Sequence, residues 1–175
     1  RALEFALLLT VPATVGLIAI PYQIVEVLFQ RGEFGSADTV QTAYALAAFA
    51  LGLPAFVLVK AFGPGYYARQ DTVTPVKIAG LTLLANIVLA YGLMRVMGHA
   101  GIALATSITA WLNALLLGGI LHRRSYFVVD SRLKRFMPRL TISVVIMGAA
   151  LWLGAQALAE PFNGDLKHQV VALGI

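Results

Sequence analysis

The stretch KAFGPGYYARQDTVTPVK, from Lys60 to Lys77, decides how this chain folds. A long apolar segment ends in Gly63, Pro64 and Gly65, a short polar turn follows, and a second long apolar segment restarts at Pro75. Glycine and proline close together are typical of a helix break. The stretch therefore predicts two membrane helices that meet at a polar turn.

Apolar residues dominate the chain on both sides of this turn. Hydrophobic residues make up 59% of the 175 residues and charged residues only 12%, which excludes an ordinary soluble domain. The apolar blocks are long enough to cross a hydrocarbon core of ~30 Å. They cover residues 2–20, 40–67, 76–94, 101–121 and 140–158, with a partial block at 169–175. We expect an all-α, polytopic membrane protein with five complete transmembrane helices and the start of a sixth.

Prolines and short polar segments interrupt the blocks. Pro12 and Pro54 lie inside the first and second blocks, where a membrane helix tolerates a kink. Residues 22–31 have the spacing of a short helix that lies at the membrane interface. Because the chain starts at Arg1 without a signal pattern and stops inside an apolar run, we expect it to be a piece of a longer protein.

The net charge of +5 is explained by membrane topology rather than by nucleic-acid binding, because the basic residues lie in short loops between apolar blocks. The turn 66–77 carries Arg69 and Lys77 against Asp71. The loop 122–139 carries six arginines and lysines against Asp130. These two loops are predicted to be cytoplasmic, and the alternate, charge-poor loops to lie outside.

The residue types exclude several kinds of chemistry. The chain has no cysteine, so disulfides and thiolate sites are excluded. Its three histidines lie at predicted loop edges without the spacing of metal ligands. The Gly63 to Gly65 segment does not match a phosphate-binding loop. We expect no catalytic residues, no metal site and no cofactor.

Charged residues near the turn are the first candidates for a functional site. Lys60 lies within a predicted span, where a cation marks a functional site or else extends its side chain to the interface; both interpretations stay open. Arg69 and Asp71 either form an ion pair within the turn or meet a charged headgroup.

Polar residues inside the spans are the second group of candidates. Asn86, Thr106 and Asn113 could face a cavity or coordinate an ion, but the third to fifth spans contain no carboxylate to complete an ion site. Their default role is to form hydrogen bonds between helices. Small residues such as Gly101 and Ala105 predict close packing of the fourth span.

Three stretches together point to a known family. They are LFQRGEF at 28–34, KAFGPGYYARQDTVTPVKIA at 60–79 and HAGIALATSITAWLNALLL at 99–117. The sequence resembles the MurJ (MviN) family, the bacterial lipid II flippases. The likeness runs from the first span to the basic loop, and GPGYYARQDTVTP is its most specific part.

The resemblance implies a two-lobe fold of fourteen helices in the multidrug/oligosaccharidyl-lipid/polysaccharide exporter superfamily. It implies that this chain holds most of the C-terminal lobe, and that the N-terminal lobe and membrane lipids are its partners. In the family the arginines that bind the substrate pyrophosphate lie mainly in earlier helices. Lys60, Arg69 and Asp71 match a recurring family motif, and segment 140–158 would contribute to a groove for the lipid tail.

The implied function is transport of lipid II from the inner to the outer leaflet of the cytoplasmic membrane by alternating access, for cell wall synthesis. Pro12, Pro54 and the Gly63 to Gly65 segment would be bending points, and ion coupling stays open. One alternative is a flippase for another polyprenyl-linked oligosaccharide. Another is a membrane enzyme that acts on a polyprenyl-linked substrate, and a third is a helical binding platform.

Overall fold

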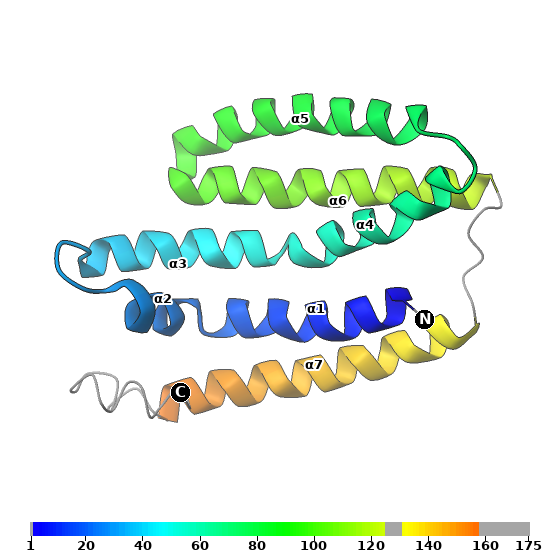
Figure 1. Ribbon diagram of the computed structural model, residues 1–175. Coiled ribbons are helices and arrows are strands. Elements are labelled where there is room, and N and C mark those ends of the chain that lie inside the picture. Colours follow the sequence, from blue (N-terminus) through cyan, green and yellow to red (C-terminus); the bar gives the residue numbers. More distant parts are fainter. Residues whose placement is uncertain (1, 125–130, 158–175) are drawn as a thin grey trace.

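The computed structural model describes residues 2–124 and 131–157, and in this part of the chain every regular element is a helix (Figure 1). The helices are α1 (Ala2–Ala19), α2 (Pro21–Phe29), α3 (Ser36–Ala50), α4 (Leu53–Tyr67), α5 (Val73–Met97), α6 (His99–Arg123) and α7 (Ser131–Ala157). The expected all-α architecture is confirmed. The partial sixth span at 169–175 lies outside the described residues.

Several of these helices are long and apolar enough to cross a membrane. Segment Ser36–Tyr67, helix α5 and helix α6 each meet this condition. Helices α1 and α2 form a fourth span if they are taken together, although they meet at an angle of 80°. The apolar part of α7, Pro138–Leu151, is shorter than a full span. The chain is therefore a polytopic membrane protein, and α2 is a short helix close to the one that the spacing at 22–31 predicts, while its place at the membrane interface stays a prediction.

The ends of the helices alternate between the two ends of the bundle. Figure 1 shows the start of α1, the α4–α5 turn, the end of α6 and the start of α7 at one end of the bundle. The α2–α3 loop and the α5–α6 turn lie at the opposite end. The loop 66–77 and the ends of the loop 122–139 therefore share one side, as the charge pattern requires.

The basic loop is shorter than expected. Residues 122–139 were expected to form a loop, but α6 continues to Arg123 and α7 already begins at Ser131. Hydropathy marks where the hydrocarbon ends, whereas a helix continues beyond that point because lysine and arginine are good helix formers in water. Helices α5 and α6 also extend beyond the predicted 76–94 and 101–121 at both ends, and Arg95 and Arg123 lie in the added C-terminal residues.

The break in the second span does not lie where the glycines predict it. Helix α4 runs through Gly63, Pro64 and Gly65 to Tyr67, so the interpretation of this segment as a helix breaker is wrong. Pro64 lies in the last turn, where its missing N–H costs one intrahelical bond at most. Gly65 faces Leu121 of α6, and a Cβ added here would lie 3.4 Å from that side chain. A Cβ here would make an ordinary contact, so α4 passes close to α6 at this point without requiring glycine.

The observed break separates α3 from α4 at Leu51 and Gly52, two residues before Pro54. Helix α6 supplies donors for the carbonyls that the break exposes. The Ser107 hydroxyl donates to Ala48 O at 2.5 Å, and the Trp111 indole donates to Leu51 O at 2.9 Å. A broken membrane helix is stable only where such partners exist, which explains why the chain breaks here.

Small residues allow the α5–α6 hairpin to pack at close range, as predicted. Gly98 turns the chain with φ of 60° and ψ of −134°, a conformation that favours glycine. A Cβ at Gly101 would lie 2.3 Å from the carbonyl oxygen of Leu93. Ala103 and Ala105 are fully buried. The hairpin therefore brings the backbones of α5 and α6 into contact.

Candidate functional site

Several polar residues of α5 and α6 gather in one open groove. Helices α5 and α6 form most of it, α4 contributes Phe56, and its volume is about 220 Å³. Its lining residues are Phe56, Ala79, Thr82, Leu83, Asn86, Thr106, Thr109, Ala110 and Asn113. All three predicted residues, Asn86, Thr106 and Asn113, are among them. The sequence separation of 27 residues between the asparagines is bridged by the antiparallel hairpin.

The groove lies near the middle of the helices that form it. Asn86 is close to the centre of α5 (Val73–Met97), and Asn113 is close to the centre of α6 (His99–Arg123). In a membrane this position corresponds to the hydrocarbon midplane, where water is scarce. Polar groups at this depth are costly, so they mark transport pathways in many membrane proteins.

The two asparagines have unsatisfied acceptors. The Oδ1 atoms of Asn86 and Asn113 are buried, and neither has a hydrogen-bond partner among the described residues. A buried polar atom without a partner costs about 1 to 3 kcal/mol. The expected hydrogen bonds between helices are therefore not made by these oxygens in the described part of the chain. Both asparagine side chains line the groove, and their Oδ1 atoms keep unused capacity to accept hydrogen bonds.

The threonines of the groove satisfy their hydroxyl protons within their own helices. Thr106 donates to Ile102 O at 2.9 Å, and Thr82 donates to Ile78 O at 3.0 Å. The expectation that Thr106 bonds to another helix is therefore wrong. Such bonds use the hydroxyl proton and leave the oxygen lone pairs available. The threonine oxygens add acceptors to the groove, as the asparagines do.

Lys60 shares a face of α4 with the groove. Phe56 lines the groove, and Lys60 follows it by four residues, so both side chains lie on one face of the helix. Lys60 is exposed, one turn closer to the end of the bundle that holds the α4–α5 turn. Lys60 is not among the residues that line the groove, but it lies on the Phe56 face of α4, one turn beyond Phe56.

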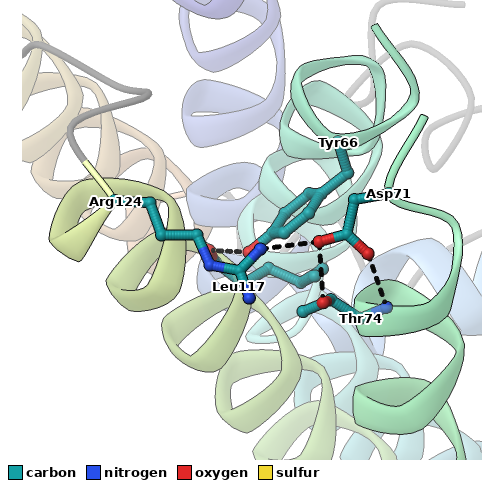
Figure 2. A network of polar contacts seen from close by, with 5 residues as sticks. All are labelled: Tyr66, Asp71, Thr74, Leu117 and Arg124. Atoms are coloured by element: carbon teal, nitrogen blue, oxygen red, sulfur yellow. Dashed lines mark hydrogen bonds and ion pairs between the residues drawn. The ribbon is translucent and has the colours of Figure 1, made fainter. Parts of the chain in front are cut away.

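A second polar cluster lies at the end of the bundle that holds the α4–α5 turn (Figure 2). Tyr66 is 1% exposed and its hydroxyl donates to Leu117 O of α6 at 2.7 Å. Asp71 accepts hydrogen bonds from Thr74 N at 3.0 Å and from the Thr74 hydroxyl at 2.8 Å. Arg124 donates to Asp71 at 2.7 Å. The cluster ties the turn to the end of α6.

Asp71 is ionised at neutral pH for reasons visible in this cluster. The hydrogen bonds from Thr74 lower the pKa of the Asp71 carboxyl below its usual value, and the Arg124 guanidinium lowers it further. Asp71 also stabilises the first turn of α5, because its carboxylate accepts the otherwise unpaired Thr74 N–H. The residue is therefore both a helix cap and one half of an ion pair.

The predicted ion pair within the turn is replaced by one between distant segments. Asp71 pairs with Arg124, which lies 53 residues away, rather than with Arg69. Arg69 is exposed in the turn. Sequence reasoning also missed Tyr66 and Thr74, although both lie in the stretch that resembles the known family. The only signal for Arg124 is its place in a basic segment, which does not identify a partner.

Comparison with known proteins extends over almost the whole chain. The family model described as lipid II flippase MurJ matches residues 1–167. The chain belongs to the MurJ family of lipid II flippases. A relative from Rhizobium meliloti (strain 1021), named "Probable lipid II flippase MurJ", is 44% identical over 173 residues, which are 99% of this chain and 32% of the relative.

Two further relatives show how widely the likeness extends. A "Probable lipid II flippase MurJ" of Vibrio cholerae is 40% identical over 145 residues, 82% of this chain and 28% of that protein. A "Lipid II flippase MurJ" of Burkholderia cenocepacia is 33% identical over 151 residues, 86% of this chain and 29% of that protein. The chain spans about a third of the length of the curated relatives that it matches.

Both polar clusters, the groove and the Asp71 cluster, lie in the part of the chain that matches the family. The Asp71 cluster lies within the GPGYYARQDTVTP stretch on which the resemblance is based. The groove lies next to it along α5 and α6. Within residues 2–124 and 131–157 no group of three or more histidines, cysteines or carboxylates could hold a metal ion. What the two clusters offer is hydrogen bonding and charge.

Proposed function

We propose that the intact protein containing this chain moves lipid II from the inner to the outer leaflet of the cytoplasmic membrane, as a transporter without enzymatic chemistry. The match to the lipid II flippase family over residues 1–167 carries the proposal. The transported lipid would supply peptidoglycan synthesis in the cell wall. The segments 66–77 and 122–139, at the end of the bundle that holds the α4–α5 turn, are then cytoplasmic, consistent with their basic residues.

The groove provides part of the polar path that such transport needs. A pyrophosphate and a sugar-peptide headgroup cannot cross hydrocarbon unaided, because each bare charge costs several kcal/mol. Hydroxyl and amide protons of the headgroup can be bonded by the free oxygens of Asn86 and Asn113. Lys60, on the same side of the unit, complements the negative charge of a pyrophosphate.

The Asp71 cluster links the α4–α5 turn to α6 at the cytoplasmic end. It holds the α4–α5 turn to α6 through Tyr66, Thr74 and Arg124, so these helices move together during alternating access. Pro54, beside the break in the second span, is a bending point within this unit. Pro12 and the Gly63 to Gly65 segment stay candidates, and coupling to an ion stays a separate proposal.

Isosteric substitution of threonine tests the groove with a matched control. Thr106→Val and Thr10→Val each remove a hydroxyl that donates to a carbonyl four residues earlier, at 2.9 and 2.7 Å respectively. Only Thr106 lines the groove. We expect the Thr106→Val protein to flip lipid II more slowly in liposomes, while Thr10→Val behaves as wild type. Equal rates for all three proteins would show that the Thr106 oxygen contacts no substrate.

A flippase for another polyprenyl-linked oligosaccharide is the second candidate. It would use the same groove, since the acceptors bind any headgroup rich in hydroxyl and amide protons. Reconstituted protein offered lipid II and an unrelated polyprenyl-linked oligosaccharide separates the two. The proposed function requires faster transport of lipid II, and preference for the other lipid would refute it.

A further inference from the structure

A crevice between α1 and α7 lies apart from the groove and from the Asp71 cluster. Figure 1 shows the two helices side by side, both beginning at the proposed cytoplasmic end. The crevice has a volume of about 540 Å³, within the range of ligand pockets. Its described lining residues are Leu8, Pro12, Arg139, Leu140, Ser143, Val144 and Met147.

The lining changes from charged to apolar along the crevice. Arg139, Ser143 and Met147 follow one another at intervals of four residues, so they form a single row along α7. Leu140 and Val144 are 6% and 5% exposed and form the floor, where they pack with Leu7 of α1. A guanidinium, a hydroxyl and a thioether thus succeed one another from the cytoplasmic end inward.

This gradient matches one kind of molecule. The row from Arg139 to Met147 is about 12 Å long at 1.5 Å per residue, close to the depth of one leaflet, roughly 15 Å. A lipid of the cytoplasmic leaflet carries its headgroup at the membrane surface and its acyl chains inward, in the same order. Arg139 binds a phosphate oxygen better than a neutral group because its guanidinium donates charge-assisted hydrogen bonds.

We propose that this crevice is a binding site for an anionic phospholipid of the cytoplasmic leaflet. The headgroup phosphate contacts Arg139, the Ser143 hydroxyl donates to the headgroup or ester region, and one acyl chain lies between Leu8, Pro12 and Met147. A phospholipid fits the crevice better than a second transmembrane helix, because its phosphate would pair with Arg139 at the same end of the crevice where its headgroup lies. The crevice uses part of segment 140–158, which the resemblance assigns to the groove for the substrate's lipid tail, so the proposal gives this part of the segment a phospholipid instead.

Native mass spectrometry of the intact protein tests the site with phosphatidylglycerol and phosphatidylcholine as probes. We expect wild type to retain phosphatidylglycerol in preference to phosphatidylcholine. Arg139→Gln should lower that retention about tenfold, the effect of one charge-assisted contact, while Arg139→Lys should preserve part of it. Arg123→Gln is the matched control, because Arg123 is exposed at the same end of the bundle but lies outside the crevice.

A second variant tests the apolar half. Ser143→Trp fills the crevice between the headgroup and chain positions, so it should abolish retention of phosphatidylglycerol without changing Arg139. Equal retention of the two lipids by wild type, or equal loss in Arg123→Gln and Arg139→Gln, would overturn the proposal. A competition experiment gives a further test, in which undecaprenyl phosphate or additional phosphatidylglycerol is added to protein that already holds phosphatidylglycerol. If undecaprenyl phosphate removed the bound lipid more effectively, the crevice would serve the substrate, and the proposal would be overturned. The Ser143→Cys variant tests whether the crevice is open. If this cysteine resists labelling in lipid-free protein, another protein segment covers the site, and the proposal is overturned.

Discussion

Replacement of Gly101 by alanine is a stringent test of the α5–α6 hairpin. The added Cβ would lie 2.3 Å from Leu93 O and 2.5 Å from Leu93 C, whereas ordinary contacts begin at 3.4 Å. Both atoms belong to the backbone, so no rotamer change relieves the clash. The helices must separate by roughly 1 Å, and such overpacking costs about 1 to 3 kcal/mol. The Gly101→Ala protein should be less stable by that amount.

Gly92 provides the matched control on the same hairpin. A Cβ at Gly92 meets no atom within 4 Å, so Gly92→Ala changes only helix propensity. Alanine is favoured over glycine within a helix by up to about 1 kcal/mol, so this variant should be as stable as wild type or more stable. The free energies of unfolding of the two variants should therefore differ by about 1 to 4 kcal/mol.

The assay is reversible unfolding of the intact protein in mixed detergent micelles, followed by circular dichroism. The opposite signs of the two alanine substitutions are the essential result. If Gly101→Ala proved as stable as Gly92→Ala, the backbones of α5 and α6 would not be in contact, and the position of the groove between them would have to be revised.

Three further predictions concern the turn and the break. Tyr66→Phe should lower the free energy of unfolding by about 1 kcal/mol through loss of one buried hydrogen bond, whereas Tyr67→Phe, at an exposed position, should stay within about 0.5 kcal/mol of wild type; equal effects would contradict this. Asp71→Ala should destabilise more than Asp71→Asn, because asparagine still caps α5. Folding lowers the pKa of the Asp71 carboxyl, so the stabilisation by its charge is fully present above the usual pKa of 3.8 and is lost as pH falls through the lower pKa of the folded state. The free energies of unfolding of wild type and Asp71→Asn should therefore still differ at pH 6, and equal values at that pH would refute this. Trp111→Phe removes the donor to Leu51 O, so it should cost about 1 kcal/mol and speed amide hydrogen exchange at the break, and unchanged exchange would contradict the role of this bond.

The alternation of the helices between the two ends of the bundle could be predicted from hydropathy, whereas the count of five full spans and the detailed partners could not: three helices of the described residues, or four with the bent α1–α2 pair, are long and apolar enough to span. Block lengths and loop charges indicated the helices and the shared side of the two basic loops. The position of the break depended on something else, because Gly52 and the Gly63 to Gly65 segment look equally disruptive in sequence. The break at Gly52 is the one whose exposed carbonyls find donors on α6, Ser107 and Trp111.

Polar residues were found by sequence reasoning more readily than their contacts. Asn86, Thr106 and Asn113 stand out because the surrounding residues are apolar, and the hairpin brings them together. Asp71 was also recognised, but its partner Arg124 is 53 residues away and depends on how far α6 continues beyond the membrane. Helix ends in water are set by propensity and capping, which hydropathy does not report.

The measurement that tests the central claim most directly combines transport with stability in the Asn86→Leu, Asn113→Leu double variant. Leucine removes both unpaired oxygens from the groove, so stability should not fall, while the rate of lipid II flipping in liposomes should fall about tenfold or more per lost hydrogen bond to the headgroup. Undiminished flipping, or a loss of flipping that only parallels unfolding, would contradict a substrate path along this groove.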